Sequence, residues 1–513
     1  MPEGGTDRRA VIAGAAVFAG AVVASAIWAR LEQGTGGTGE GFDPGFAGVL
    51  PSLGDGPPFR LTVAEVDITP GHGVSMIGYG YKPRLSNGRC ARRLRAQCAV
   101  LRDPDGRVLV LVRVDAGALA YDVYRSIVDT LVAEGIVAAA SDFMINISHT
   151  HSGPALGMHP DPRVLTQLPD EGIGGVQATA EAFKNKVIDL VRAAHRAPGE
   201  PVLLAHAVGR AEVGMLRWVQ GLSGPTELPV LIARNADNGK LEAVIYSYPC
   251  HPVCRGNDTV FDADFCGVAS TVISAELKAP ALFLQGTGGN VDPVGQGGGE
   301  ARVHLVGQAL AEAVVKTVRD TRFGRIKGGL DAAIDEVALP FAPDLSNADA
   351  VAQLRRRYQE RIIQLQAGPT KDGAARRHAE LMVALIDAGR LPRGVEMTTQ
   401  VWRLGELRIV GMAHEVVNAY TGYVRRLAES DDVWVLGYTN HVECYLPSDA
   451  GLTSGGYAAG WNEESGRYFP GVAGSVMGYG WPAPLRSTLD AKPGAPGVEE
   501  MVLQRLERLL RIG

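Results

Sequence analysis

The sequence predicts a mixed α/β fold, and two observations support this prediction. Strand-like apolar runs at residues 108–114 and 143–147 alternate with helix-like segments at residues 122–134 and 179–195, an order typical of α/β proteins. The 65 glycines and 30 prolines are spread along the 513 residues, which indicates many tight turns between short strands. With 46% hydrophobic and 21% charged residues, the chain is long enough for one large or two modest domains.

The N-terminus has the pattern of an export segment. Arg8 and Arg9 precede an uncharged stretch at residues 10–29, which contains the small-residue pattern Ala24-Ser-Ala26 of a signal-peptidase site. We therefore expect residues 1–30 to be a signal peptide or a membrane anchor. The arginines favour a cytoplasmic N-terminus and an exported body, which is either secreted or held at the membrane by this segment.

The rest of the chain divides into a linker and one large domain. Residues 31–58 are rich in Gly and Pro and are expected to act as a tether. Residues 59–513 are expected to form the catalytic body. Within it, residues 347–366 and 374–389 show helical spacing with many surface charges, which predicts a helical hairpin inserted at about residues 345–391. A hairpin of this kind commonly serves as a lid or a brace.

The last helix is expected at residues 498–512. Its apolar residues recur on one face and should pack on the core: Val498, Val502, Leu506, Leu509 and Leu510. The net charge of −6, with the two signs interspersed, provides no basic face, so no nucleic-acid partner is expected. The sequence does not predict an oligomeric state.

The most informative segment is residues 146–154, Asn-Ile-Ser-His-Thr-His-Ser-Gly-Pro. In an extended segment, side chains two residues apart point the same way, so His149 and His151 can converge on one metal ion or one substrate. The alternative is that both are structural histidines with ordinary hydrogen bonds.

Three further strand ends carry chemistry-bearing residues. His251 lies at a proline-marked turn after the run 241–248, and Glu415 follows the run 407–412 at the expected start of a helix. A third run ends in the turn at residues 437–449. Two histidines and one carboxylate form a standard set for a catalytic zinc, which lowers the pKa of bound water from about 15.7 to roughly 7.

Together these motifs resemble the neutral ceramidase family of zinc amidases, from about residue 61 to residue 510. The segments Leu61-Thr-Val-Ala-Glu-Val-Asp-Ile-Thr-Pro70 and Met76-Ile-Gly-Tyr-Gly80 are similar to the family's first strand and glycine turn, and His-Thr-His-Ser-Gly-Pro is its most specific motif. The resemblance implies the N-terminal catalytic domain of that family with four zinc ligands: His149, His251, Glu415 and Tyr445. It places three further residues near the reacting carbonyl: His151, Tyr457 and Arg217.

Three departures from the family bear on the substrate. The family's Gly-Asp-Val-Ser-Pro motif reads Gly289-Asn-Val-Asp-Pro293, so Asp292 stands where the family has a serine with a catalytic part. Glu415 follows His414 where the family has a glycine. The chain is also expected to lack the C-terminal immunoglobulin-like domain. We expect Asp292 to orient a neighbouring group or to handle a proton.

The expected activity is zinc-dependent amide hydrolysis of an N-acylated, lipid-like small molecule by attack of zinc-bound water, a ceramidase-like reaction of sphingolipid metabolism. His151 is the best candidate to protonate the leaving amine, since an unperturbed imidazole has a pKa of about 6.5. Tyr457 and Arg217 are expected to help His151 stabilise the negative charge on the carbonyl oxygen. The alternatives are a zinc-dependent esterase and an exported binding protein without turnover.

Several other residues have two interpretations. The glycines at residues 285–293 lack the Lys-Ser/Thr ending of a phosphate loop and are expected to line the site with free amides as an anion nest, with Asn290 and Asp292 behind it. Asp115, at the end of a strand, is either a turn residue or an orienter of a ligand histidine. Three cysteines near His251 predict buried thiols or one disulfide: Cys250, Cys254 and Cys266.

Overall fold

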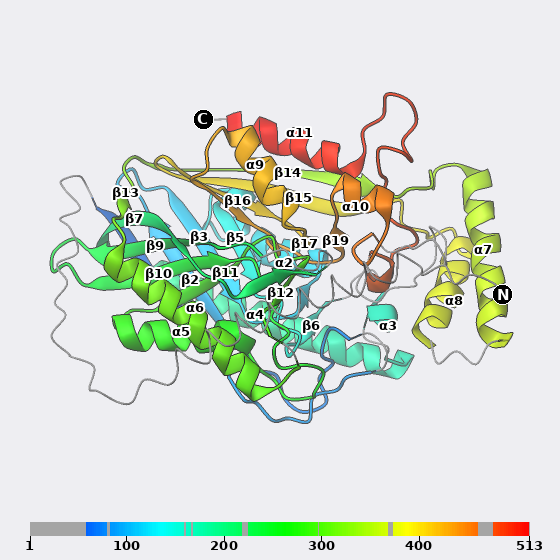
Figure 1. Ribbon diagram of the computed structural model, residues 1–513, viewed down its shortest axis with the longest axis horizontal. Helices are drawn as coiled ribbons and strands as arrows, with labels where there is room; N and C mark the ends of the chain where they lie inside the picture. The colour runs from blue at the N-terminus through cyan, green and yellow to red at the C-terminus, as the bar shows by residue number, and fades with distance from the viewer. Residues whose placement is uncertain are drawn as a thin grey trace, which may run out of the picture.

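Two β-sheets packed face to face form the centre of the molecule (Figure 1). The computed structural model describes residues 58–79, 83–157, 161–165, 168–217, 224–295, 297–367, 373–459 and 476–511. The predicted export segment and nearly all of the predicted linker lie outside these residues. Among the described residues, none of the helices is both long enough and apolar enough to cross a bilayer.

The larger sheet has nine strands in the order β11-β10-β9-β7-β1-β2-β3-β5, with β13 beside β7. Neighbours are antiparallel except for the parallel pairs β3/β5 and β10/β11. The strands are β1 (Phe59–Asp67), β2 (Arg95–Arg102), β3 (Val108–Val114), β5 (Phe143–Ile147), β7 (Glu200–Arg210), β9 (Glu227–Asn235), β10 (Leu241–Tyr248), β11 (Ala281–Gln285) and β13 (Gly324–Arg325). The predicted strands at residues 108–114, 143–147 and 241–248 are confirmed.

The smaller sheet has the order β14-β15-β16-β18. Its strands are β14 (Leu330–Pro340), β15 (Gly394–Leu404), β16 (Leu407–Met412) and β18 (Val433–Leu436). Alternate residues of a strand face opposite sides, so Trp402 packs between the two sheets with Leu111 and Leu204, while its neighbour Val401 packs on the other face. This alternation makes a continuous apolar layer between the sheets.

Helices cover both outer faces of the sheet pair (Figure 1). On the larger sheet lie α2 (Tyr121–Ala133), α4 (Ile173–Arg196), α5 (Asp264–Leu277) and α6 (Glu300–Asp320); on the smaller sheet lie α9 (Ala419–Ala428) and α11 (Val498–Arg511). The apolar face expected for the last helix is confirmed, since all five of its residues are buried. The mixed α/β prediction is therefore correct.

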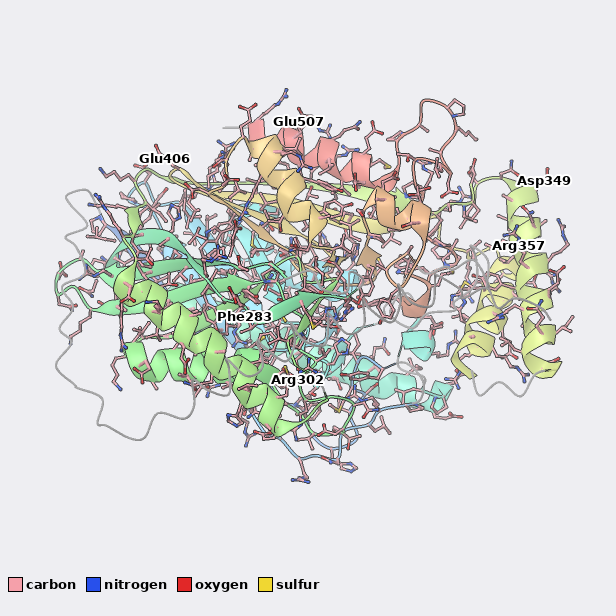
Figure 2. All side chains as sticks on the ribbon, viewed as in Figure 1. Phe283, Arg302, Asp349, Arg357, Glu406 and Glu507 are labelled. Atoms are coloured by element: carbon pink, nitrogen blue, oxygen red, sulfur yellow. The ribbon has the colours of Figure 1, made fainter. Side chains whose placement is uncertain are left out.

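A helical hairpin made of α7 (Ala348–Ala367) and α8 (Gly373–Asp387) projects at one end of the molecule (Figure 1). Its helices agree with the predicted insertion to within two residues. Figure 2 shows Asp349 and Arg357 on the outer part of α7, whereas Phe283 lies in the interior, where it is 1% exposed. The hairpin side chains Tyr358 and His378 are buried against the segment around residue 481.

The two sheets meet where the carboxyl ends of several strands converge. Bridges join Asn146 to Thr439 and Gly286 to Leu436. The buried amide of Asn146 donates to the carbonyl oxygen of Gly437 (2.9 Å) and accepts from the backbone N–H of Gln285 (2.7 Å). The edge strands β5 and β11 of the larger sheet and the end of β18 are thereby held together.

Short elements complete the fold at this junction and around it. They are β4 (Ala118–Leu119), β6 (Ala155–Leu156), β8 (Gly214–Leu216), β12 (Val291–Pro293), β17 (Glu415–Val416), β19 (Tyr445–Leu446), α3 (Pro162–Leu165), α10 (Asp449–Ser454), η1 (Ala140–Asp142), η2 (Asp170–Gly172) and η3 (Met477–Tyr479). The prediction that Glu415 opens a helix is wrong. Glu415 instead pairs with Tyr445 in the two-stranded ladder β17/β19, because the backbone N–H of Glu415 donates to Cys444.

A candidate metal centre

The candidate ligands come from three strand ends at the sheet junction. His149 follows β5, His251 follows β10, and Glu415 lies just beyond β16. The Oε2 atom of Glu415 lies 3.2 Å from Nε2 of His149 and 3.2 Å from Nε2 of His251. All three residues are buried.

His151 lies beside this group. Its Nε2 is 3.2 Å from Nε2 of His149, and the ligand atoms of His149, His151 and His251 lie within 4.8 Å of one another. Zinc bonds of about 2.0–2.2 Å place neighbouring ligand atoms of a tetrahedral site roughly 3.3–3.6 Å apart, close to the 3.2 Å separations found here. This histidine cluster could therefore hold a metal ion, with the Glu415 carboxylate as a further ligand atom.

Backbone carbonyls orient the two buried histidines. Nδ1 of His149 is hydrogen-bonded to the carbonyl oxygen of Gly117, and Nδ1 of His251 is hydrogen-bonded to that of Gly288 at 2.9 Å. A carbonyl can only accept, so the proton lies on Nδ1 and the lone pair of each Nε2 faces the centre. Among the described residues, Asp115 contacts no histidine; it pairs with Arg113 at 2.5 Å and accepts from the backbone of Arg95.

The glycine-rich loop contributes the carbonyl of Gly288 to the site, and three of its amides are engaged in backbone hydrogen bonds. The amides of Gly288, Gly289 and Val291 donate to the carbonyls of Gly286, Val416 and Gly288. The expected anion nest is thus wrong for these three groups. The side chain of Asn290 accepts from the backbone of Asn418, so it braces the loop behind the site.

Two tyrosines hold the carboxylate of Glu415. The hydroxyl of Tyr479 donates to Oε1 at 2.6 Å, and that of Tyr438 lies 3.5 Å from Oε2 and 3.3 Å from Nδ1 of His251. Burial raises the pKa of Glu415, but His149 and His251 outweigh burial and hold its pKa well below the usual range. Burial and then Arg217 lower the pKa of His251 to about 4. A deprotonated carboxylate beside a neutral imidazole is a pair of donors that can bind a metal ion such as zinc.

The backbone around the centre adopts an unusual conformation. His149 (φ 67°), His414 (φ 73°), Tyr438 (φ 52°) and Asn440 (φ 70°) are all in the left-handed region, as is Tyr79 (φ 58°) beside His151. Non-glycine residues adopt this region at a cost of about 1–3 kcal/mol each. Such residues cluster at functional sites, where the surrounding structure stabilises the strained backbone, and their clustering here therefore supports a functional role for this region.

Arg217, Asp292, Tyr445 and Tyr457 form a second group next to the histidines. Arg217 donates from Nε to Oδ1 of Asp292 at 2.8 Å and from Nη1 to the hydroxyl of Tyr445 at 3.0 Å. The guanidinium lies over the ring of Tyr457 at 5.6 Å, and that ring meets Tyr445 edge-on. Burial lowers the pKa of Arg217, but Tyr445 and Asp292 raise it well above its usual value. Arg217 therefore stays charged, and its guanidinium interacts mainly with the Asp292 carboxylate and the Tyr445 hydroxyl.

Two solved structures share this arrangement of sheets and helices. One is neutral ceramidase from Pseudomonas aeruginosa, with a TM-score of 0.64 and 17% identity over 89% of this chain and 74% of that one. The fold is that of neutral ceramidase. The other is a ceramidase complexed with C2, with a TM-score of 0.65 and 17% identity over 89% of this chain and 75% of that one. No family model and no curated protein matches the chain.

Within this ceramidase fold, the structure brings His149, His151, His251 and Glu415 together as the sequence motifs implied. The described contacts of Tyr445 are with Arg217, Tyr457 and the β17 ladder, so its role as a ligand stays a prediction. The catalytic roles expected for His151, Tyr457, Arg217 and Asp292 also stay predictions. The cysteines expected near His251 are free buried thiols.

Sequence reasoning missed Tyr438 and Tyr479. Tyr438 lies two residues beyond β18, so the strand-end rule that found His251 could have found it. Tyr479 lies in the irregular segment Met477-Gly-Tyr-Gly-Trp481, where no periodic pattern marks a functional position.

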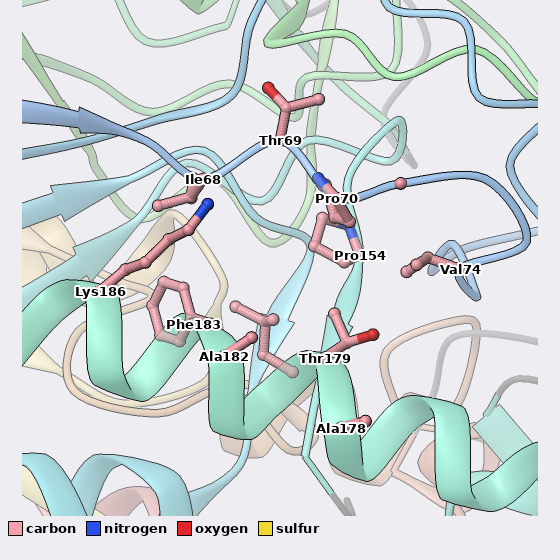
Figure 3. A pocket seen from close by; sticks show the side chains of 12 residues that line it. Ile68, Thr69, Pro70, Val74, Pro154, Ala178, Thr179, Ala182, Phe183 and Lys186 are labelled. Carbon is pink, nitrogen blue, oxygen red and sulfur yellow. The ribbon is translucent and has the colours of Figure 1, made fainter.

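A groove of about 260 Å³ lies apart from the histidines, between α4 and the loop after β1 (Figure 3). Phe183 and Lys186 of α4 face Ile68 and Pro70 across it, and Pro154 of the histidine motif borders it. Its walls are mainly apolar and include none of the candidate ligands.

Proposed function

We propose that this protein is a zinc-dependent amidohydrolase that cleaves the amide bond of an N-acylated, lipid-like substrate. The observation that carries the proposal is the convergence of one carboxylate oxygen of Glu415 on the Nε2 atoms of two buried histidines, His149 and His251, at 3.2 Å each. The ceramidase fold of the two solved structures supports the reaction class, since those proteins are ceramidases by name.

In this proposal His149, His251, Glu415 and Tyr445 hold the zinc. When bound, zinc lowers the pKa of a coordinated water to about 7 and so supplies a nucleophile at neutral pH. Burial, and then the neighbouring imidazoles of His149 and His251, lower the pKa of His151 well below its usual value. His151 is therefore neutral before the reaction and is proposed to accept a proton and pass it from a ring nitrogen to the leaving amine.

The second group of side chains is proposed to face the scissile carbonyl. Tyr457 can donate to the carbonyl oxygen, and Arg217 supplies positive charge beside it. Asp292 keeps Arg217 oriented through the 2.8 Å ion pair. A serine at this position, as in the family that the motifs resemble, carries no charge and could not form this ion pair. The negative charge of Asp292 beside Arg217 also makes this site less suited to an anionic substrate.

The N-terminal segment is proposed to export the enzyme and hold it at the outer membrane face. A substrate with an acyl chain partitions into lipid, and residues 10–29 provide the apolar stretch that would keep the enzyme near it. A variant that lacks residues 1–55 is expected to lose vesicle binding and to retain zinc and activity on a short-chain N-acyl amide.

Metal analysis combined with a hydrolysis screen tests the proposal. The wild-type protein is expected to carry one zinc per chain and to cleave N-acyl amides faster than matched esters. His149→Ala and His251→Ala should lose zinc and activity together, whereas the matched control His304→Ala, a 60% exposed histidine, should retain both.

Three outcomes would overturn parts of this proposal. Full zinc in the His149→Ala, His251→Ala double variant would remove the metal assignment. Faster cleavage of esters would indicate the esterase alternative. Bound zinc with no turnover of any amide or ester would indicate a binding protein.

A further inference from the structure

We infer that Tyr479 is a positioning residue for Glu415, and that the α7–α8 hairpin holds Tyr479 in place. The inference rests on the proposed metal centre. It assigns a specific task to the hairpin, whose two helices are separate in sequence from every candidate ligand.

Tyr479 divides the two oxygens of Glu415 between two tasks. Its hydroxyl donates to Oε1 at 2.6 Å, while Oε2 faces both Nε2 atoms at 3.2 Å. Tyr479 is 2% exposed, so water does not compete for this hydrogen bond. A carboxylate with one oxygen engaged presents only the other to a metal, and such partners of ligands fix both their direction and their basicity.

The segment that carries Tyr479 is the short turn η3, in which Val476, Met477 and Tyr479 are buried. The backbone N–H of Tyr479 donates to Val476 at 3.2 Å, and Gly480 follows in the left-handed region with φ 109°. Hydrogen bonds to the residues that follow Tyr479 hold the turn further.

Those next residues are anchored from two sides. The indole N–H of Trp481 donates to the carbonyl of Glu443 at 2.6 Å, in the segment that leads to Tyr445. From the hairpin, the hydroxyl of Tyr358 donates to the carbonyl of Pro482 at 2.5 Å, and Nε2 of His378 binds the carbonyl of Trp481 at 2.9 Å.

The two hairpin side chains are suited to this task. Tyr358 is 0% and His378 1% exposed, and each directs its hydrogen bond to one of two successive carbonyls directly after the Tyr479 turn. A buried carbonyl that loses its donor is left unsatisfied, so these two hydrogen bonds favour the braced position of the turn. The hairpin thus acts on the metal centre as a brace through Pro482, Trp481 and Tyr479.

Zinc affinity of the full-length, metal-stripped protein tests this chain of contacts. Zinc is titrated against a chromophoric chelator of known affinity. Tyr479→Phe is expected to weaken binding about 10- to 100-fold, as is typical when a ligand loses its orienting partner. Tyr246→Phe is the matched control, since its buried hydroxyl bonds Ser270 in a different part of the core; it should bind zinc as tightly as wild type.

The hairpin is tested by Tyr358→Phe, which removes only the hydroxyl that binds Pro482. It is expected to weaken zinc binding by about threefold to tenfold, less than Tyr479→Phe because the His378 contact remains. If Tyr358 acts through Tyr479, the double variant should bind zinc no more weakly than Tyr479→Phe alone.

The outcomes separate this inference from the proposed function. Wild-type protein that binds no zinc would defeat the proposed function. Wild-type zinc affinity in Tyr479→Phe, with binding lost in His149→Ala, would overturn the positioning role. A Tyr358→Phe protein with a lower Tm and unchanged zinc affinity would overturn the role of the hairpin. The Tyr358→Phe measurement still tests the inference if Tyr479→Phe does not fold.

Discussion

Replacing Asn146 with alanine is expected to destabilise the fold by about 3 to 5 kcal/mol. The Asn146 side chain is 0% exposed and lies where the two sheets meet. Its Oδ1 accepts from the backbone of Gln285 at 2.7 Å, and its Nδ2 donates to the carbonyls of Gly437 at 2.9 Å and of Gln285 at 3.3 Å.

The magnitude follows from what each partner loses. The backbone N–H of Gln285 would be buried without an acceptor, which costs about 1–3 kcal/mol. The two donated hydrogen bonds are each worth about 1 kcal/mol, and the carbonyl of Gly437 keeps the hydroxyl of Thr439 at 3.0 Å as a second donor. The main loss is therefore the orphaned N–H at the end of β11.

Urea unfolding at neutral pH measures this loss. Asn87→Ala is the matched control, since Asn87 is exposed and its side chain accepts only from the nearby backbone of Arg89 in the described contacts. The control should change the free energy of unfolding by less than about 0.5 kcal/mol. A loss below about 1 kcal/mol for Asn146→Ala would refute the view that this amide ties the sheets together.

Three more predictions concern the surroundings of the site. Burial raises the pKa of Asp264 from 3.8 to about 6, so the folded state is stabilised by the protonated carboxyl below about pH 4 and loses this stability as pH rises through 6. The free energy of unfolding of the wild type should therefore fall by about 3 kcal/mol between pH 4 and 7.5, and Asp264→Asn should remove this fall. An equal dependence of the free energy of unfolding on pH in both proteins would contradict this. A Cβ at Gly289 would lie 2.6 Å from the carbonyl oxygen of Glu415, so Gly289→Ala should cost about 1–3 kcal/mol in urea unfolding and weaken zinc binding. Asp292→Ser should lower kcat/KM on the native substrate about tenfold, because Arg217 loses its ion pair; higher turnover on every substrate would count against this role.

Periodic patterns predicted the elements of the fold well because burial on one face repeats along a strand or helix. The strands at residues 108–114 and 143–147 and the helix ending the chain were found in this way. The sequence predicts that Glu415 opens a helix directly after the apolar strand at residues 407–412, and this prediction is wrong. The pairing of Glu415 with Tyr445 depends on a ladder formed with a distant segment, which no local pattern encodes.

Some residues of the candidate site could likewise be predicted from local sequence patterns, and others could not. His149, His251 and Glu415 lie at strand ends and could be predicted, since strand ends are where functional side chains gather. The role of Gly288 as a hydrogen-bond acceptor for His251 could not, because glycine loops supply either amides or carbonyls according to their backbone angles. Tyr479 could not be predicted either, because its position depends on contacts with a hairpin far away in sequence.

The convergence of strand ends at the sheet junction also bears on how the protein folds. Chain segments around residues 149, 251 and 415 must all be in place before the histidines and the carboxylate come within 3.2 Å. Contacts between segments so distant in sequence form slowly, because the loops between them must close first. Metal capture would then be a late event in folding, and the rate at which a refolding chain acquires metal would report on the completion of both sheets.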